Sequence, residues 1–107
     1  MKEKGSPGDA FEAVAKAFFR DHPEITNEWR TVKSRWWGDR IQLVCAAGSS
    51  HEVYASLKGG QISVGDRDDH YDFEDFGRNI PDEEVALEAF NHLVELLSQH
   101  GHLGALT

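Results

Sequence analysis

The sequence predicts an α+β fold: an antiparallel meander sheet of four or five strands, flanked by an N-terminal helix and a long C-terminal helix, in the order α-β-β-β-β-α. Helical periodicity of apolar residues is confined to the two ends of the chain. Between them, short stretches of β-type residues are separated by only a few turn residues, which favours antiparallel connections. The length of 107 residues corresponds to one domain. We expect it over residues 9–107, after a flexible tail of residues 1–8.

The first helix is expected to begin at Asp9, whose carboxylate suits the N-cap position. It should end near residues 21–22, because Pro23 disfavours helical geometry in the residue before it. Its apolar stripe consists of Phe11, Val14, Ala15 and Phe18.

Strands are expected over residues 29–36, 40–46, 52–57 and 61–65. The second strand alternates, with Ile41, Leu43 and Cys45 on one side and Gln42, Val44 and Ala46 on the other. Gly59 and Gly60 connect the third and fourth strands, since glycine accepts the positive φ angles of tight hairpins. Residues 70–76 alternate more loosely and predict either a fifth, edge strand or an ordered loop.

The last helix should open at Pro81, because proline and the acids that follow it both suit a helix start. It should end near His100, before Gly101. Its apolar stripe consists of Val85, Ala86, Ala89, Phe90, Leu93, Leu96 and Leu97. Its solvent-exposed side consists of Glu84, Glu88, Asn91 and Glu95. The two helices are expected to cover one sheet face and to leave the other to solvent or a partner.

The formal net charge of −8 argues against nucleic acid as a direct partner. Residues 1–40 hold eight Lys/Arg and seven Asp/Glu, whereas residues 41–107 hold three and twelve. The start of the chain lacks an apolar signal region, and no stretch approaches the roughly 20 apolar residues of a membrane span. We therefore expect a cytoplasmic protein with no membrane contact.

The negative charge is concentrated in the acidic segment, which we define as residues 64–77. It carries six carboxylates, those of Asp66, Asp68, Asp69, Asp72, Glu74 and Asp75. Such a density accelerates encounter with a basic protein and rejects acidic ones. We predict that these acids bind a basic protein partner, with Tyr71 and Trp37 as apolar anchors. Phe73 and Phe76 could also serve as such anchors, but their competing role in the core of so small a domain is favoured, and the sequence leaves the choice between core and interface open.

Catalytic and metal chemistry find less support. An EF-hand register fails from Asp66 and from Asp72, because position 5 would be His70 or Phe76. A looser divalent-metal site or enzyme built on Asp66, Asp68, His70 and Asp72 remains as an alternative. The lone Cys45 lies in an apolar run and is expected to be a buried, inert thiol. We predict no catalytic residues, no metal and no cofactor.

Several stretches (DFEDFG at 72–77, PDEEVA at 81–86, EAF at 88–90 and VELL at 94–97) resemble small acidic bacterial immunity proteins. These proteins belong to polymorphic toxin, contact-dependent inhibition and type VI secretion systems. The resemblance covers residues 29–100 and implies a non-catalytic inhibitor that occludes a toxin effector domain, often a nuclease. Two alternatives are a phage-encoded, nucleic-acid-mimicking inhibitor of a defence complex and a scaffold whose acids only maintain solubility. The sequence leaves open whether the protein is a monomer or a homodimer.

Overall fold

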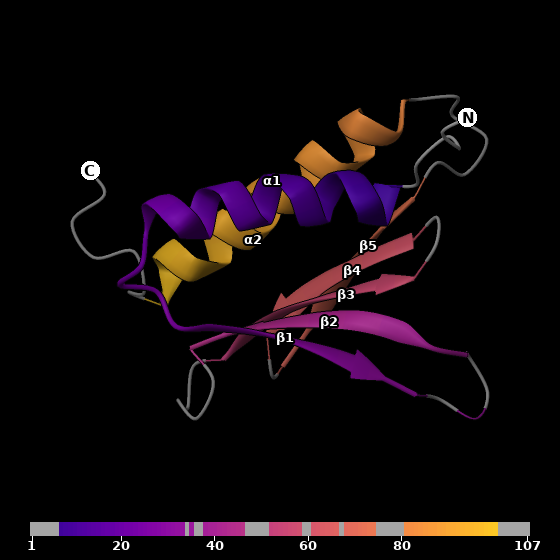
Figure 1. The fold of residues 1–107 in the computed structure, drawn as a ribbon, viewed down its shortest axis with the longest axis horizontal. Helices are drawn as coiled ribbons and strands as arrows, with labels where there is room; N and C mark the ends of the chain where they lie inside the picture. Colours follow the sequence, from indigo (N-terminus) through magenta and orange to yellow (C-terminus); the bar gives the residue numbers. More distant parts are fainter. Residues whose placement is uncertain are drawn as a thin grey trace.

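The computed structural model describes residues 7–33, 35, 38–46, 52–58, 61–66, 68–74 and 81–100. A helix, five strands and a second helix follow one another along the chain (Figure 1). They are α1 (Pro7–Asp21), β1 (Asn27–Val32), β2 (Arg40–Cys45), β3 (Val53–Lys58), β4 (Gln61–Asp66), β5 (His70–Glu74) and α2 (Asp82–Gln99). The α+β prediction is confirmed, and residues 70–74 form the fifth strand rather than a loop.

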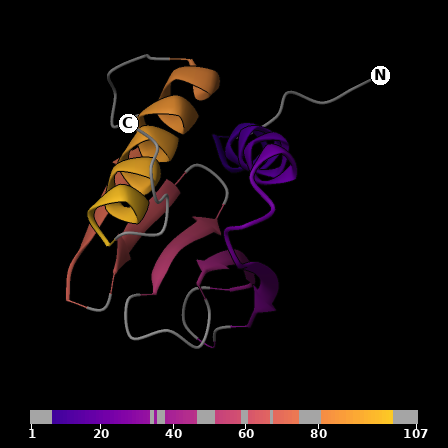
Figure 2. The same cartoon turned by 90° about the vertical axis from the view of Figure 1, so that its left-hand side faces the viewer.

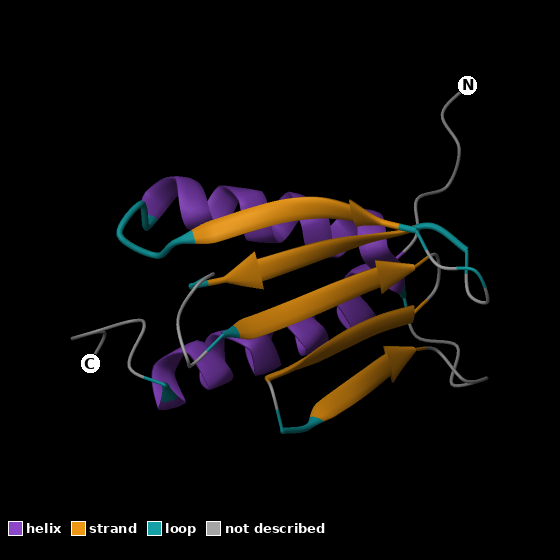
Figure 3. Ribbon diagram, turned by 90° about the horizontal axis from the view of Figure 1, so that it is seen from below, coloured by secondary structure: helices purple, strands orange, loops and turns teal. Residues whose placement is uncertain are grey.

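The sheet is an antiparallel meander in which neighbours in sequence are neighbours in space, in the order β1-β2-β3-β4-β5. Both helices lie on the same face, and the view from below shows the other face uncovered (Figure 3). Seen end-on, α2 lies over the β5 side of the sheet, where it contacts β3, β4 and β5, and α1 lies beside α2 toward the β1 side and contacts α2 and β4 (Figure 2). Strands β1 and β5 are therefore the two edges of the sheet.

The core fills the space between the sheet and the helices. The two helices pack through Phe90, whose ring centroid lies 5.9 Å from that of Phe11 and 5.2 Å from that of Phe18. The whole predicted stripe of α2 is buried, and Leu43, Val53, Ala55, Ile62 and Val64 supply the sheet side. Burial of this contiguous apolar surface is the main stabilising contribution to the domain.

The helix α1 begins at Pro7, two residues before the expected start. Proline suits the first helical turn because its missing N–H has no intrahelical acceptor there. Pro7 and Gly8 thus belong to the helix rather than to the tail, and residues 1–6 lie outside the described residues. Asp9 lies within the first turn, where its charge suits the helix dipole.

Strand β1 begins and ends earlier than predicted, at Asn27 and Val32. In β2, successive side chains point to opposite faces of the sheet, as predicted, but their burial does not alternate in the same way. Ile41 shares a face with Leu43 yet is 37% exposed, because it lies at the start of the strand, beside the β1–β2 connection. Val44 lies on the uncovered face and is only 5% exposed. Neighbouring strands therefore bury part of the uncovered face without a helix.

The helix α2 starts after Pro81, which occupies the N-cap without a side-chain hydrogen bond. Asp82, Glu83 and Glu84 in the first turn complement the positive end of the helix dipole. The helix ends at Gln99, and the N–H of the C-cap residue His100 donates to the carbonyl of Leu96 (3.0 Å). No helix among the described residues is long and apolar enough to cross a membrane.

Candidate functional site

The described part of the acidic segment, residues 64–66 and 68–74, lies in the β4–β5 hairpin, whose register sends its side chains to both faces of the sheet. Tyr71 pairs with Val64 and Phe73 with Ile62, so both aromatic residues lie on the helix-covered face. Asp72 pairs with Ser63 on the uncovered face. The carboxylates therefore do not form a single flat strip. Asp66 of β4 lies on the helix-covered face, Asp72 of β5 lies on the uncovered face, and Asp68 and Asp69 lie in the turn between the strands.

Asp66 is the structural acid of the hairpin. Its Oδ1 accepts hydrogen bonds from the backbone N–H groups of Asp68 (3.0 Å) and Asp69 (3.1 Å). Its Oδ2 lies 3.1 Å from Nε2 of His100 at the end of α2. These hydrogen bonds, that to His100 first, hold the pKa of Asp66 below its ordinary value. Asp66 therefore organises the turn and ties it to α2, and it is a poor candidate for direct partner contact.

Asp68, Asp69 and Asp72 are exposed. The carboxylate of Asp69 accepts a hydrogen bond from the backbone N–H of His70 (2.8 Å), and that of Asp72 accepts one from the hydroxyl of Ser63 (2.6 Å). Such bonds orient the carboxylates without removing them from solvent. For these three residues, binding of a partner stays a prediction.

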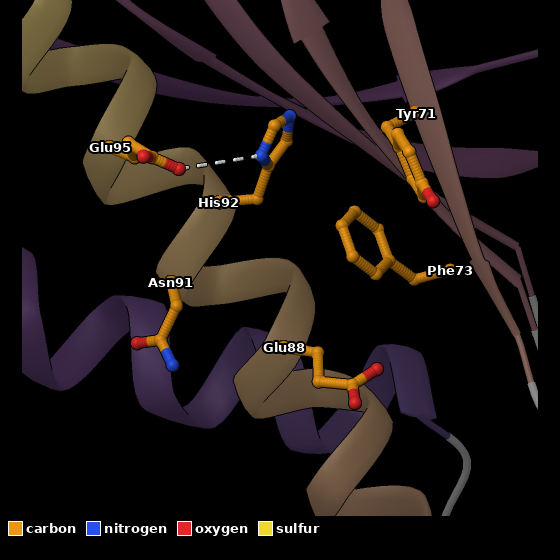
Figure 4. Close-up of a pocket in the computed structure, with 6 residues that line it drawn as sticks. All are labelled: Tyr71, Phe73, Glu88, Asn91, His92 and Glu95. Carbon is orange, nitrogen blue, oxygen red and sulfur yellow. Dashed lines mark ion pairs between the residues drawn. The ribbon is translucent and has the colours of Figure 1, made fainter.

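A pocket of about 410 Å³ lies between β5 and α2 (Figure 4). Tyr71 and Phe73 come from β5, and their ring centroids are 5.1 Å apart. His92 of α2 completes a three-ring cluster, 5.8 Å from Tyr71 and 5.6 Å from Phe73. Phe73 packs against the hydrophobic core, as predicted, whereas Tyr71 is 62% exposed. The pocket thus has an anchored aromatic floor and one accessible ring.

The α2 wall of the pocket is acidic. Glu88, Asn91, His92 and Glu95 line it, and Nδ1 of His92 lies 3.9 Å from Oε1 of Glu95 (Figure 4). Two of the lining residues in the described part of the chain are glutamates, and none is Lys or Arg. Aromatic faces beside carboxylates attract a cation through both the ring quadrupole and direct charge. This arrangement suits recognition of a basic side chain.

The sequence assigned Glu88, Asn91 and Glu95 only to a solvated helix face and gave His92 no role. Their spacing of three, four and seven residues did place them on one flank of the helix. The sequence does not show that this side of the helix lies next to the acidic segment, because that depends on how α2 packs across the sheet.

Trp37, Asp75 and Phe76 lie outside the described residues, as does the side chain of Glu74, whose backbone belongs to β5. For the metal alternative, Asp66 and Asp72 are on opposite faces of the hairpin, by register. Among the residues that the structure describes, no three His, Cys, Asp or Glu side chains are grouped so as to hold a metal ion.

Comparisons with known proteins add no assignment: no protein-family model, no curated protein and no solved structure matches this chain.

Proposed function

We propose that this protein is a non-enzymatic inhibitor that binds a basic protein domain along one border of its fold and thereby blocks a bacterial toxin effector. The β5–α2 border, as we define it, consists of Asp68 and Asp69 of the β4–β5 turn, Asp72 of β5, and Glu88 and Glu95 of the pocket. One observation carries the proposal: two glutamates of α2 line a pocket with an exposed aromatic ring, and the β5 strand beside that pocket carries further exposed carboxylates on its other face and in the preceding turn.

The border has the two properties that a protein-binding surface needs. Its charges steer a positively charged partner and suppress acidic competitors, which raises the association rate. Its rings supply apolar contact that charge alone does not provide, and Tyr71 is the residue best placed to become buried on binding. The carboxylates lie both on α2 and on the far side of β5, which fits a macromolecular partner better than a small cation.

The choice of a toxin effector rests on the resemblance to immunity proteins together with this surface. A secreted nuclease binds phosphates through a basic cleft, and a row of carboxylates can occupy that cleft in place of nucleic acid. The mechanism is steric and electrostatic blockade and requires no catalytic group on this chain.

The test uses two double variants with equal changes in net charge. The border variant carries Asp68→Lys and Asp72→Lys, both at exposed positions of the β5–α2 border. The control variant carries Asp21→Lys and Asp39→Lys, exposed at the end of α1 and in the β1–β2 connection. Each tagged chain is purified from its native host, and co-purifying proteins are identified by mass spectrometry.

We expect a basic partner with the wild type and the control variant, and its loss with the border variant. The purified pair should associate about tenfold more slowly when the border is reversed at low salt, with weaker salt dependence. Expression of the partner alone should arrest growth, and co-expression of the wild type should restore it. Equal binding by all three proteins contradicts the assigned surface. A partner whose expression is harmless contradicts the immunity function.

A further inference from the structure

The backbone of β5 is arranged to accept another strand. Within the described sheet β5 is an edge, paired only with β4. The N–H of Asp66 donates to the carbonyl of Asp69 (2.9 Å), which makes them a hydrogen-bonded pair of the ladder. Hydrogen-bonded and non-hydrogen-bonded pairs alternate in antiparallel sheets. Tyr71 and Phe73 therefore direct their backbone groups toward β4, whereas His70 and Asp72 direct theirs outward.

One outward group is already occupied. The N–H of His70 donates to the side chain of Asp69 (2.8 Å), as expected for a group that points away from β4. A sixth strand would form hydrogen bonds with the next outward groups of β5. These are the carbonyl of His70 and the N–H and carbonyl of Asp72. The side chain of Asp69 therefore occupies the first outward N–H of β5. The backbone groups that a partner strand could pair with begin at the carbonyl of His70.

The pocket lies where alternate side chains of a sixth strand would fall. A new strand would run about 4.8 Å outside β5, with successive side chains on opposite faces. Those on the helix-covered face would lie beside Tyr71 and Phe73, in the space between β5 and α2. Those on the uncovered face would lie beside the carboxylate of Asp72. Both faces of the added strand would meet negative charge.

An arginine fits the pocket better than an apolar side chain. Its methylene stem and planar guanidinium can lie against Tyr71 and the aromatic cluster, while its charge faces the carboxylates of Glu88 and Glu95. A second copy of this chain fits less well, because pairing two β5 edges would bring like charges together across the new ladder.

We propose that β5 receives an extended, positively charged segment of the partner as a sixth strand, with an arginine of that segment in the β5–α2 pocket. This mode of binding rests on the proposed function for its basic protein partner. It adds that recognition combines main-chain hydrogen bonds for affinity with alternate side chains for specificity.

The first test uses an acetylated, amidated hexapeptide of alternating arginine and valine, with its glutamate–valine counterpart and N-acetyl-arginine amide as controls. Binding to the isotope-labelled full chain is followed by NMR and by amide hydrogen exchange. We expect the basic peptide to bind and to slow exchange of the Asp72 amide about tenfold or more. The acidic peptide should not bind, and the single arginine should shift only signals of the pocket.

A matched pair of variants isolates the backbone contribution. Asp72→Ala and Asp72→Pro both remove the carboxylate, but only proline also removes the outward N–H, without removing a donor to β4. We expect the peptide to bind the proline variant about tenfold more weakly than the alanine variant. Tyr71→Ala should weaken binding by a similar factor, whereas Leu87→Ala, on the outer face of α2, should not.

Three outcomes overturn the proposal. One is peptide binding without protection of the Asp72 amide, a readout on the wild type that stands even if the proline variant fails to fold. Another is equal binding by the alanine and proline variants. The third is a concentration-dependent dimer that Asp72→Pro abolishes, which would assign the edge to a second copy. Peptide addition at β5 with no growth protection by the full chain would keep this proposal and reject the immunity function.

Discussion

Asp66 and His100 join the two parts of the fold that form the β5–α2 border: Nε2 of the histidine lies 3.1 Å from Oδ2 of the aspartate. The aspartate belongs to the end of β4 and the histidine to the C-terminal end of α2. The same carboxylate holds the β4–β5 turn through two backbone N–H groups. One side chain therefore sets both the shape of the hairpin and its attachment to the helix beside the pocket.

The first prediction concerns this contact and its pH dependence. Asp66→Asn keeps an oxygen acceptor for the turn and removes the charge that faces His100, so we expect a loss of about 1 kcal/mol near neutral pH. Because the pKa of Asp66 is lowered from 3.8 by folding, its charged form stabilises the fold above that value. The contribution is lost as pH falls through the lowered pKa.

Urea unfolding of the wild type and Asp66→Asn at pH 7, 5 and 3, and at lower pH while the wild type stays folded, measures this difference. It should be present at pH 7 and 5 and should shrink at the acid end, as Asp66 becomes protonated. Asp68→Asn, an exposed neighbour in the same turn, serves as the control and should show little change. A difference between wild type and Asp66→Asn that failed to shrink at the acid end would contradict the assignment.

The second prediction concerns Gly65, which lies opposite His70 in the β4–β5 ladder. A Cβ atom at this position would overlap the backbone carbonyl of Asp69 and the Cα of His70. Backbone atoms cannot move aside as a flexible side chain can, so Gly65→Ala should destabilise the hairpin by about 1–3 kcal/mol. Thermal unfolding checks this, with Ser56→Ala on the neighbouring β3 as the control. An unchanged melting temperature would show that the hairpin does not need this close approach.

The third prediction separates the core from the surface of α2. Leu93 is fully buried, whereas Leu87 on the same helix is 48% exposed. Leu93→Ala should cost about 2–5 kcal/mol, because it removes buried methyl groups and leaves a cavity. Leu87→Ala should stay within about 0.5 kcal/mol of the wild type in denaturant titrations. Similar losses for the two variants would mean that α2 lies on the sheet in a different rotation.

The fourth prediction concerns the single cysteine. Cys45 is fully buried, and burial raises its pKa to about 12. Only about one thiol in ten thousand is ionised at pH 8, and that thiolate lies out of reach of a reagent. We expect no modification of the native protein by iodoacetamide and complete modification in denaturant, as measured by mass spectrometry. Rapid native labelling would indicate local opening of β2.

The helices and the buried stripe of α2 followed from local patterns. Residues that recur at helical spacing must share one side of a helix, and a wide apolar side must be buried, so the seven predicted positions could be read without a structure. The order of the strands in the sheet could also be predicted from the sequence, because short connections make consecutive strands neighbours in space. The alternation of residues 70–76 did not distinguish a strand from a loop, because it is weak and because Phe73 packs on a core formed by distant segments.

The sequence by itself determined the density of negative charge and its position near Tyr71. Only the tertiary structure decided what each acid does. The hairpin register separates Tyr71 from Asp72, and the contact of Asp66 with a histidine 34 residues away changes a binding candidate into a structural residue. The glutamates of α2 join the site only because the helix crosses the sheet beside β5. Local patterns specify which faces of an element are apolar or charged, whereas the neighbours of a face depend on packing between distant segments.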